Sequence, residues 1–224
     1  EALFRYCKGA EDLEGEALSQ ISNGGLDRPV YVTVAGPTSV MTARIVDQCK
    51  SLYFDWPNLN LNYIIMDLDQ RLSLVRSGQV TMAIIPPEQV PNEMDSKKLK
   101  PDRYVLVASP SWKGRRILDI LENERVIDFD EADPTTLNYL KKFNLSSPLK
   151  RSRLYVNNNE AIIKLFCAGV GFGTLTQEIA RPYLTSGDLI TLNGGAIMDD
   201  PLALVWYPRK ETPPYLKAVI SKIK

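Results

Sequence analysis

The sequence contains no histidine, and only three of its 224 residues are cysteine. The absence of histidine removes the commonest general base and metal ligand, together with every serine or cysteine triad that relies on an imidazole. The three cysteines, Cys7, Cys49 and Cys167, are too widely spaced for a close metal-ligand motif. We therefore expect a protein that is not an enzyme and that carries no cofactor and no metal.

Other absences limit the setting in which the chain works. Three cysteines cannot all pair within one chain, and each lies in a segment of helical character, so we interpret them as reduced thiols of a cytoplasmic protein. The sequence has no run of about 18 apolar residues and no basic, apolar export signal near its start, so we predict no membrane association. Lys plus Arg, 27 residues, equal Asp plus Glu, 27 residues, which leaves no overall positive field for nucleic acid.

The first segment of the chain has helical spacing. Its apolar or small residues recur at intervals of three and four, which is typical of a helix that packs against a partner helix, and they are Leu3, Tyr6, Ala10, Leu13 and Ala17. An ordinary amphipathic helix packed on its own domain is the alternative. Ser22-Asn23-Gly24-Gly25 then predicts a flexible break.

After the break, strands and helices alternate. We predict strands at 30–35, 61–66 and 81–85, separated by a helix at 40–54 and by a helix that follows Asp67 and ends at Gly78, and two such strand-helix-strand units imply a parallel sheet. A smaller cycle follows, with strands at 104–108, 125–129, 153–156 and 172–175 and helices at 116–122, 134–143, 158–168 and from Thr176. A strand at 202–207 and a helix at 214–223 complete an α/β protein.

Several segments resemble the effector domain of LysR-type transcriptional regulators. Residues 30–40 are similar to that family's first strand and helix-capping turn, and residues 69–84, DQRLSLVRSGQVTMAI, to its pattern of helix, glycine and strand. In the second segment Val80-Thr81-Met82 replaces the family's usual residues, so its aspartate is missing. Residues 156–175 match the family's capped helix, glycine-x-glycine turn and short buried strand, and the GDLI at 187–190 fits its next turn.

The resemblance covers the whole chain and implies two Rossmann-like lobes of the type 2 periplasmic-binding-protein fold, preceded by a linker helix. It places the linker helix at 1–22, lobe I at 28–107 and 203–224, and lobe II at 108–202. It also implies an effector in the cleft between the lobes, a homodimer or tetramer, and DNA binding only through a winged helix-turn-helix outside this sequence. Residues 126–145 and the Asn-Glu-Ala at 159–161 are most similar to regulators of basic amino-acid export.

Candidate effector contacts follow from the fold class. Parallel α/β sheets bind ligands beyond the carboxyl ends of their strands, where loops and helix N-termini expose backbone NH groups. In lobe I this rule, together with the resemblance, selects Pro37, Thr38, Ser39, Asp67, Ile85 and Pro86. In lobe II it selects Asp128, Phe129, Asp130, Asn157, Asn158 and Thr174.

Several of these residues have a structural alternative. Thr38 or Ser39 is expected to cap the next helix, either as a cap alone or with the helix N-terminus left for a ligand carboxylate. Asn157 fits a capping box with Glu160, which explains it as well as a ligand contact does. Asp133 is expected to cap the helix that starts at Pro134. Asp128 or Asp130 would accept the ammonium or guanidinium group of a basic ligand, or else belong to a solvated acidic turn.

The sequence therefore favours a domain that senses an amino acid or similar carboxylate for a LysR-type regulator. The alternative is a solute-binding protein of a transporter with the same fold, which a signal peptide in the upstream coding sequence would identify. An enzyme on a similar scaffold is disfavoured, because Gly169-x-Gly171-x-Gly173 follows a helix instead of opening one and so fails as a dinucleotide motif.

Overall fold

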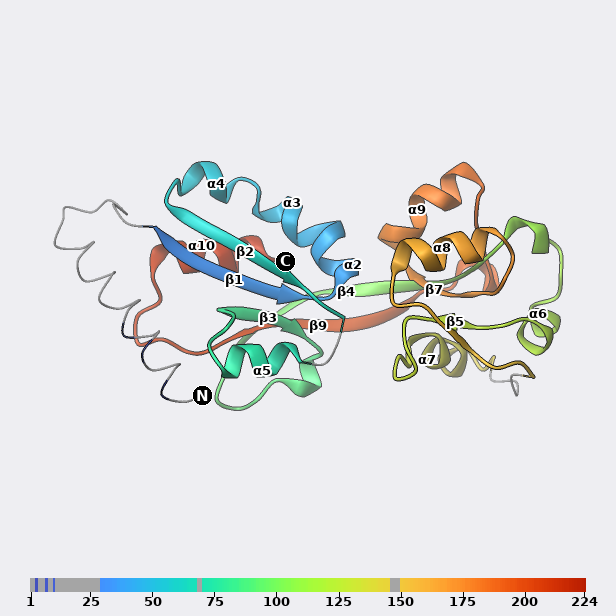
Figure 1. Cartoon of the computed structure of the whole chain (residues 1–224), viewed down its shortest axis with the longest axis horizontal. Coiled ribbons are helices and arrows are strands. Elements are labelled where there is room, and N and C mark those ends of the chain that lie inside the picture. The colour runs from blue at the N-terminus through green and yellow to red at the C-terminus, as the bar shows by residue number, and fades with distance from the viewer. Residues whose placement is uncertain (1–2, 4–6, 8–9, 11–28, 68–69, 146–149) are drawn as a thin grey trace. The chain divides into compact units, whose positions relative to one another are not determined.

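The computed structural model describes residues 3, 7, 10, 29–67, 70–145 and 150–224. The predicted linker helix and the break after it lie outside the described residues, apart from three helical positions, Leu3, Cys7 and Ala10. The described chain is α/β, as predicted, and divides into two units (Figure 1). The first contains the described residues up to Pro101 together with Pro201–Lys224, and the second contains Asp102–Asp200.

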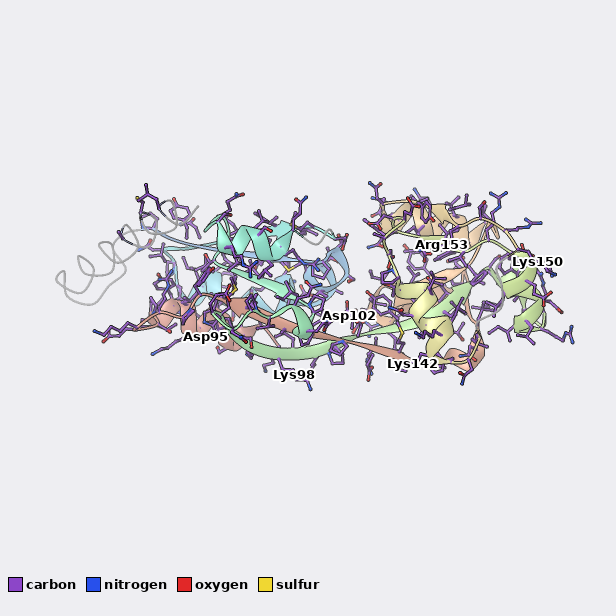
Figure 2. All side chains as sticks on the ribbon, turned by 90° about the horizontal axis from the view of Figure 1, so that it is seen from below. Asp95, Lys98, Asp102, Lys142, Lys150 and Arg153 are labelled. Atoms are coloured by element: carbon purple, nitrogen blue, oxygen red, sulfur yellow. The ribbon has the colours of Figure 1, made fainter. Side chains whose placement is uncertain are left out.

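Two strands carry the chain from one unit to the other. The unit boundaries fall inside β4 (Asp95–Ala108) and β9 (Met198–Trp206), which are both longer than the predicted strands at 104–108 and 202–207. Figure 2 labels Asp95, Lys98 and Asp102 along β4. The exposed charges on the first half of β4 concealed this strand from a search for apolar runs.

The first unit contains the predicted parallel sheet. β1 (Val30–Gly36) pairs in parallel with β2 (Leu59–Ile65) and with β3 (Met82–Ile85), and β9 joins β3 in the antiparallel direction. The strand order is therefore β2-β1-β3-β9. The β-branched and apolar run at 30–35 forms the central strand, because such side chains fit a sheet that is covered on both faces.

The helix predicted at 40–54 is instead a series of short segments. They are α2 (Thr38–Val40), the π-helical η1 (Met41–Ile45), α3 (Val46–Cys49) and α4 (Leu52–Asp55). The other helical segments of the unit are α5 (Arg71–Arg76), the short η2 (Pro87–Gln89) and α10 (Pro214–Lys222). The continuous apolar spacing could not reveal the π segment, since the extra residue per turn leaves Met41 and Ile45 buried.

Alternation along the strands of the first unit divides its core into two layers. Val32 and Val34 of β1 face a cluster with Met41, Ile45 and residues of α10, while Ala35 faces a second cluster with Val75 of α5. In Figure 1 α3 and α4 accordingly run above β1 and β2, and α5 lies below β3. The core of the sheet thus lies on both of its faces, and the loops at its strand ends are where a ligand is expected to meet polar groups.

The second unit repeats this plan on a smaller scale. β4 pairs antiparallel with β7 (Gly173–Thr176) and with β8 (Ile190–Thr191), and β5 (Ile127–Asp128) pairs in parallel with β6 (Leu154–Tyr155). Its helical segments are η3 (Pro110–Trp112), α6 (Ile117–Asn123), α7 (Thr135–Lys142), α8 (Asn159–Cys167), α9 (Gln177–Ser186) and η4 (Asn193–Gly195). β5 and β6 are shorter than the predicted strands at 125–129 and 153–156.

Two core clusters also hold the second unit together. One joins Leu106 to α6 and α7, and the other joins Val105 and Val107 to α8 and α9, so alternate residues of β4 serve opposite faces. Gly171 lets β7 approach the neighbouring backbone, because a Cβ at this position would lie 2.5 Å from the Arg125 carbonyl oxygen. Among the described residues no helix is long and apolar enough to cross a membrane.

Candidate functional site

The carboxyl ends of β1, β2 and β3 lie at one edge of the first unit, because these strands are parallel and adjacent. The turn at 37–39 follows β1, Asp67 follows β2, and Pro86 follows β3. The expected lobe I residues therefore share this edge. Ile85 is the exception in orientation, since its side chain is buried in the cluster that contains Val75.

Thr38 and Asp67 form the central contact of this edge. The backbone NH of Thr38 donates to Asp67 Oδ1 at 2.8 Å, and its hydroxyl donates to Oδ2 at 2.6 Å. The turn is fixed further by the NH of Met66, which donates to the Gly36 carbonyl at 3.0 Å. A loop after β2 is thereby tied to the first helical turn after β1.

The capping role expected of Thr38 or Ser39 is wrong. The N-cap position belongs to Pro37, whose side chain accepts nothing, and Thr38 is already the first helical residue. The anion that meets this backbone NH comes instead from Asp67, 29 positions along the chain. Spacing within the local sequence could not reveal a cap that arrives from a different strand.

The second unit gathers its candidate residues at a corresponding edge. β5 and β6 are parallel, and a parallel bridge between Val126 and Phe172 aligns the chain before β7 with them. Asp128 ends β5 and Asn157 follows β6, while Thr174 lies within β7. The polar residues at this edge are joined to one another more tightly than those of the first unit.

Asp128 is paired with an arginine that the sequence analysis did not select. The Asp128 side chain is only 1% exposed, and its Oδ2 lies 2.6 Å from both Nε and Nη2 of Arg153 (labelled in Figure 2). Burial raises the pKa of the Asp128 carboxyl, while Arg153 and the Thr136 hydroxyl lower it through hydrogen bonds. Arg153 directly precedes β6, and β6 pairs with β5. The pairing of these two strands therefore brings Arg153 next to Asp128.

Arg153 also binds the acidic turn that follows β5. Its Nη2 donates to the Asp133 carbonyl at 2.6 Å, its Nη1 donates to the Glu131 carbonyl at 3.4 Å, and its guanidinium carbon lies 5.2 Å from the Tyr155 ring centre. The guanidinium therefore contacts a carboxylate, two carbonyls and an aromatic face. One arginine holds the whole turn against the strand edge.

The rest of the acidic turn is fixed by its own backbone. Asp133 Oδ1 accepts from the NH and hydroxyl of Thr135, but α7 begins at Thr135 and its N-cap position belongs to Pro134, so the predicted cap at Asp133 is wrong by one residue. Asp130 Oδ1 accepts from the Asp133 NH at 2.8 Å, and the half-buried Phe129 donates its NH to Asp133 Oδ2 at 3.4 Å. Asp130 and Asp133 are thus turn-forming carboxylates in this structure.

Two threonines link this turn to β7. The Thr136 and Thr174 hydroxyls lie 3.0 Å apart, and the Thr174 NH donates to the Thr136 oxygen at 3.2 Å. Because Thr136 also hydrogen-bonds Asp128, a continuous network runs from Arg153 to Thr174. Sequence reasoning selected Asp128 and Thr174 but neither Arg153 nor Thr136, which is 1% exposed within α7.

The capping residue of α8 is Asn158, not Asn157. Asn158 Oδ1 accepts from the Ala161 NH at 2.9 Å, so the predicted capping box with Asn157 as the cap is wrong by one residue. The exposed Asn157 side chain is left outside the helix. A run of three asparagines made this register ambiguous from the sequence.

A shallow groove of about 500 Å³ lies along α8 and faces α9. It is lined by Glu160, Ile163, Lys164, Cys167, Ala168 and Tyr183. The lining is mainly apolar, and its α8 positions recur at helical spacing, so the groove follows one face of that helix. None of the residues that line the groove belongs to the polar strand edge described above.

Comparison with known proteins identifies the family. The family model described as LysR substrate binding domain matches residues 31–224. The chain is 22% identical over 191 residues to the HTH-type transcriptional regulator ArgP of Vibrio parahaemolyticus, covering 83% of this chain and 64% of that protein. It is 32% identical over 73 residues to YagP of Escherichia coli, covering 32% of this chain and 54% of that protein. The chain thus spans less than two thirds of either relative.

Solved structures agree on the fold. ArgP from Mycobacterium tuberculosis matches with a TM-score of 0.80 at 20% identity, over 98% of this chain and 74% of that one. Full-length LysG from Corynebacterium glutamicum, described with bound effector Arg, matches with a TM-score of 0.78 at 19% identity, over 99% and 75% of the two chains. These neighbours are LysR-type proteins whose regulatory domains have the type 2 periplasmic-binding-protein-like fold, so the expected fold class is confirmed.

The matched family and its neighbours are transcriptional regulators and not enzymes, as we expected from a sequence without histidine or a close cysteine motif. The family match covers most of the chain, and the two α/β units supply the expected secondary structure in the expected order. This chain belongs to the LysR substrate-binding domain family.

Proposed function

We propose that this chain is the effector-sensing domain of a LysR-type transcriptional regulator and that it binds an amino acid or a similar small carboxylate. The family match over residues 31–224 carries the proposal. The likeness to ArgP and to LysG, which is described with bound Arg, supports an amino-acid effector. In this proposal the domain works in the cytoplasm, within a longer protein whose winged helix-turn-helix binds DNA.

The proposed effector contacts are those expected at the two strand edges, and their joint use in one cleft stays a prediction. In the first unit the geometry favours the ammonium group of an amino acid at Asp67. Each Asp67 oxygen accepts one hydrogen bond from Thr38, and a carboxylate oxygen can accept a second. A ligand carboxylate at Thr38 would have to displace Asp67 from its contacts, so we assign that role to neighbouring groups of the edge.

We also propose that the domain forms a homodimer. Phe54 at the end of α4 is 84% exposed, and Tyr53, Tyr31 and Ile65 are exposed large hydrophobics of the same unit. A contiguous patch of exposed apolar side chains marks an association surface, so the proposal requires these four to gather on one face. The groove along α8 offers a mainly apolar counterpart on a second copy.

The sensing proposal is tested by a thermal-shift screen against free amino acids and small carboxylates, followed by calorimetry. A ligand at 100 times its dissociation constant should stabilise the fold by about 2.7 kcal/mol. Asp67→Asn should weaken binding of the best ligand, whereas the matched control Asp47→Asn, on the exposed surface of α3, should not. A screen in which no member of either class stabilises the chain would contradict the proposal.

Association is tested by sedimentation at tens of micromolar. The native chain should have a dimeric mass, and Phe54→Asp should shift it toward the monomer. The control Leu118→Asp changes another exposed apolar side chain, on α6, and should leave the mass unchanged. A monomeric native chain would count against the dimer without affecting the sensing proposal.

A further inference from the structure

The environment of Arg153 is a complete recognition site for a guanidinium group. It supplies the buried Asp128 carboxylate, the carbonyls of Glu131 and Asp133, and the ring of Tyr155. These are the groups that bind an arginine side chain by charge, by directed acceptors and by cation-π contact. In this chain the site is filled by an arginine of the chain itself.

The charges of this site balance without a ligand. Asp128 is 1% exposed and Arg153 is 15% exposed, so the pair is largely removed from water. Thr136 provides a further hydrogen bond to the Asp128 carboxyl. A second cation that reached this edge would meet a neutral pair, and a buried cation without its own acceptor is costly.

The other carboxylates of the turn are poorer acceptors for a cationic side chain than Asp128. Asp130 and Asp133 accept the backbone NH groups that shape the turn, and Glu131 is exposed. An ion pair made in open solvent contributes little, about 1 kcal/mol or less. Strong discrimination in favour of a cationic side chain therefore depends on Asp128.

We propose that Arg153 is a specificity-determining residue that excludes effectors with a cationic side chain by filling the guanidinium site of the second unit. The effector class then narrows to amino acids or related carboxylates whose side chain is neutral or acidic. This inference rests on the proposed sensing function. It separates the chain from LysG, which is described with bound effector Arg.

The test compares L-arginine with L-citrulline, which replaces the guanidinium group by a neutral group of nearly the same shape. Calorimetry with the native chain should give no preference for arginine. Arg153→Ala vacates the site and should create a preference of about tenfold or more for arginine, since a hydrogen bond to a charged group is restored. The double variant Asp128→Asn with Arg153→Ala should lose that preference.

Two further variants separate specificity from folding. Arg153→Lys keeps a cation beside Asp128 and should show no preference for arginine. Arg153→Gln keeps a long polar side chain without the charge, and it should gain the preference if Arg153→Ala proves too unstable to purify. A purely structural role for Arg153 would change the melting temperature of these variants without changing the ratio of arginine to citrulline affinity.

Two results would overturn the proposal. One is a native chain that prefers arginine to citrulline by tenfold and loses this preference in Asp128→Asn, a result that needs no Arg153 variant. The other is a pair of folded Arg153→Ala and Arg153→Gln proteins with no preference for arginine. Failure of the sensing function is distinguishable, because arginine would then bind the vacated variants while no candidate effector bound the native chain.

Discussion

The strand edges of the two units carry similar residues in different physical states. In the first unit Asp67 is half-buried and bound only by the NH and hydroxyl of Thr38 in the contacts described above. In the second unit Asp128 is buried and bound by a guanidinium, with a threonine network behind it. Among the described residues, a carboxylate at the end of a strand is therefore held by a threonine in one unit and by an internal ion pair in the other.

The largest expected effect comes from breaking the ion pair of the second unit. Arg153→Ala should lower the free energy of unfolding by about 3–5 kcal/mol, because it leaves a buried carboxylate without its cation. The double variant Asp128→Asn with Arg153→Met should recover much of this loss, since no buried charge remains. Urea denaturation measures both, and a loss below about 1 kcal/mol would show that Arg153 stabilises the second unit no more than Thr38 stabilises the first.

A smaller effect should follow from adding one methyl group in each unit. In Gly171→Ala the new Cβ would lie 2.5 Å from the Arg125 carbonyl oxygen, and this overpacking should cost about 1–3 kcal/mol. In Gly36→Ala it would lie 2.6 Å from the sulfur of Met41, which is flexible, so the cost should be below about 1 kcal/mol. Equal melting temperatures for the two variants would contradict the expected difference between meeting a backbone oxygen and meeting a flexible side chain.

Alkaline pH should reveal a difference between buried Cys49 and half-buried Cys167. Burial raises the pKa of Cys49 above 9.0, and burial also raises the pKa of Tyr63. The folded chain thus retains protons that the unfolded chain releases, and stability falls as the pH rises above about 9, by at most about 1.4 kcal/mol per pH unit for each proton.

The measurement is the slope of unfolding free energy against pH. Cys49→Ala should flatten this slope, whereas Cys167→Ala should flatten it less, because Cys167 lies in the open groove on α8. The comparison uses slopes, so the loss of packing in Cys49→Ala does not affect it. A larger change for Cys167 than for Cys49 would reverse the assignment of the more deeply buried thiol.

The smallest effect concerns the strand edge of the first unit. Thr38→Val removes the hydroxyl that donates to Asp67 Oδ2 and should lower stability by about 1 kcal/mol, the usual net value of one hydrogen bond. Thr42→Val, whose exposed hydroxyl donates to the Thr38 carbonyl, is the matched control and should change stability by less. A loss comparable to that of Arg153→Ala would mean that the Thr38 contact braces the first unit as strongly as the ion pair braces the second.

The sequence predicted the elements of the fold well where hydrophobic spacing is unambiguous. The run at 30–35 became β1, and the helix expected at 158–168 became α8, because burial imposes one period on a strand and another on a helix. The sequence-based prediction was wrong where the local pattern of residues is compatible with more than one structure. The three asparagines before α8 left the cap one residue out, and the charged first half of β4 concealed a long strand.

The candidate site shows the same division between local and tertiary information. Strand ends and residue types located Thr38, Asp67, Asp128 and Thr174 as members of two polar edges. The sequence could not show that Asp67 binds the helix start in place of a local cap, or that Arg153 neutralises Asp128. These contacts join residues 29 and 25 positions apart.

By itself, the amino-acid sequence determined the α/β class and the strand ends at which polar groups collect, since these depend on composition and on short-range spacing. The family followed from the resemblance of its motifs to those of LysR-type regulators, which the family match bears out. Only the tertiary structure decided which carboxylate contacts a threonine and which is neutralised by an arginine. That outcome depends on strand pairing. The pairing of β1 with β2 brings Asp67 to Thr38, and the pairing of β5 with β6 brings Arg153 to Asp128, although the partners are far apart in the sequence.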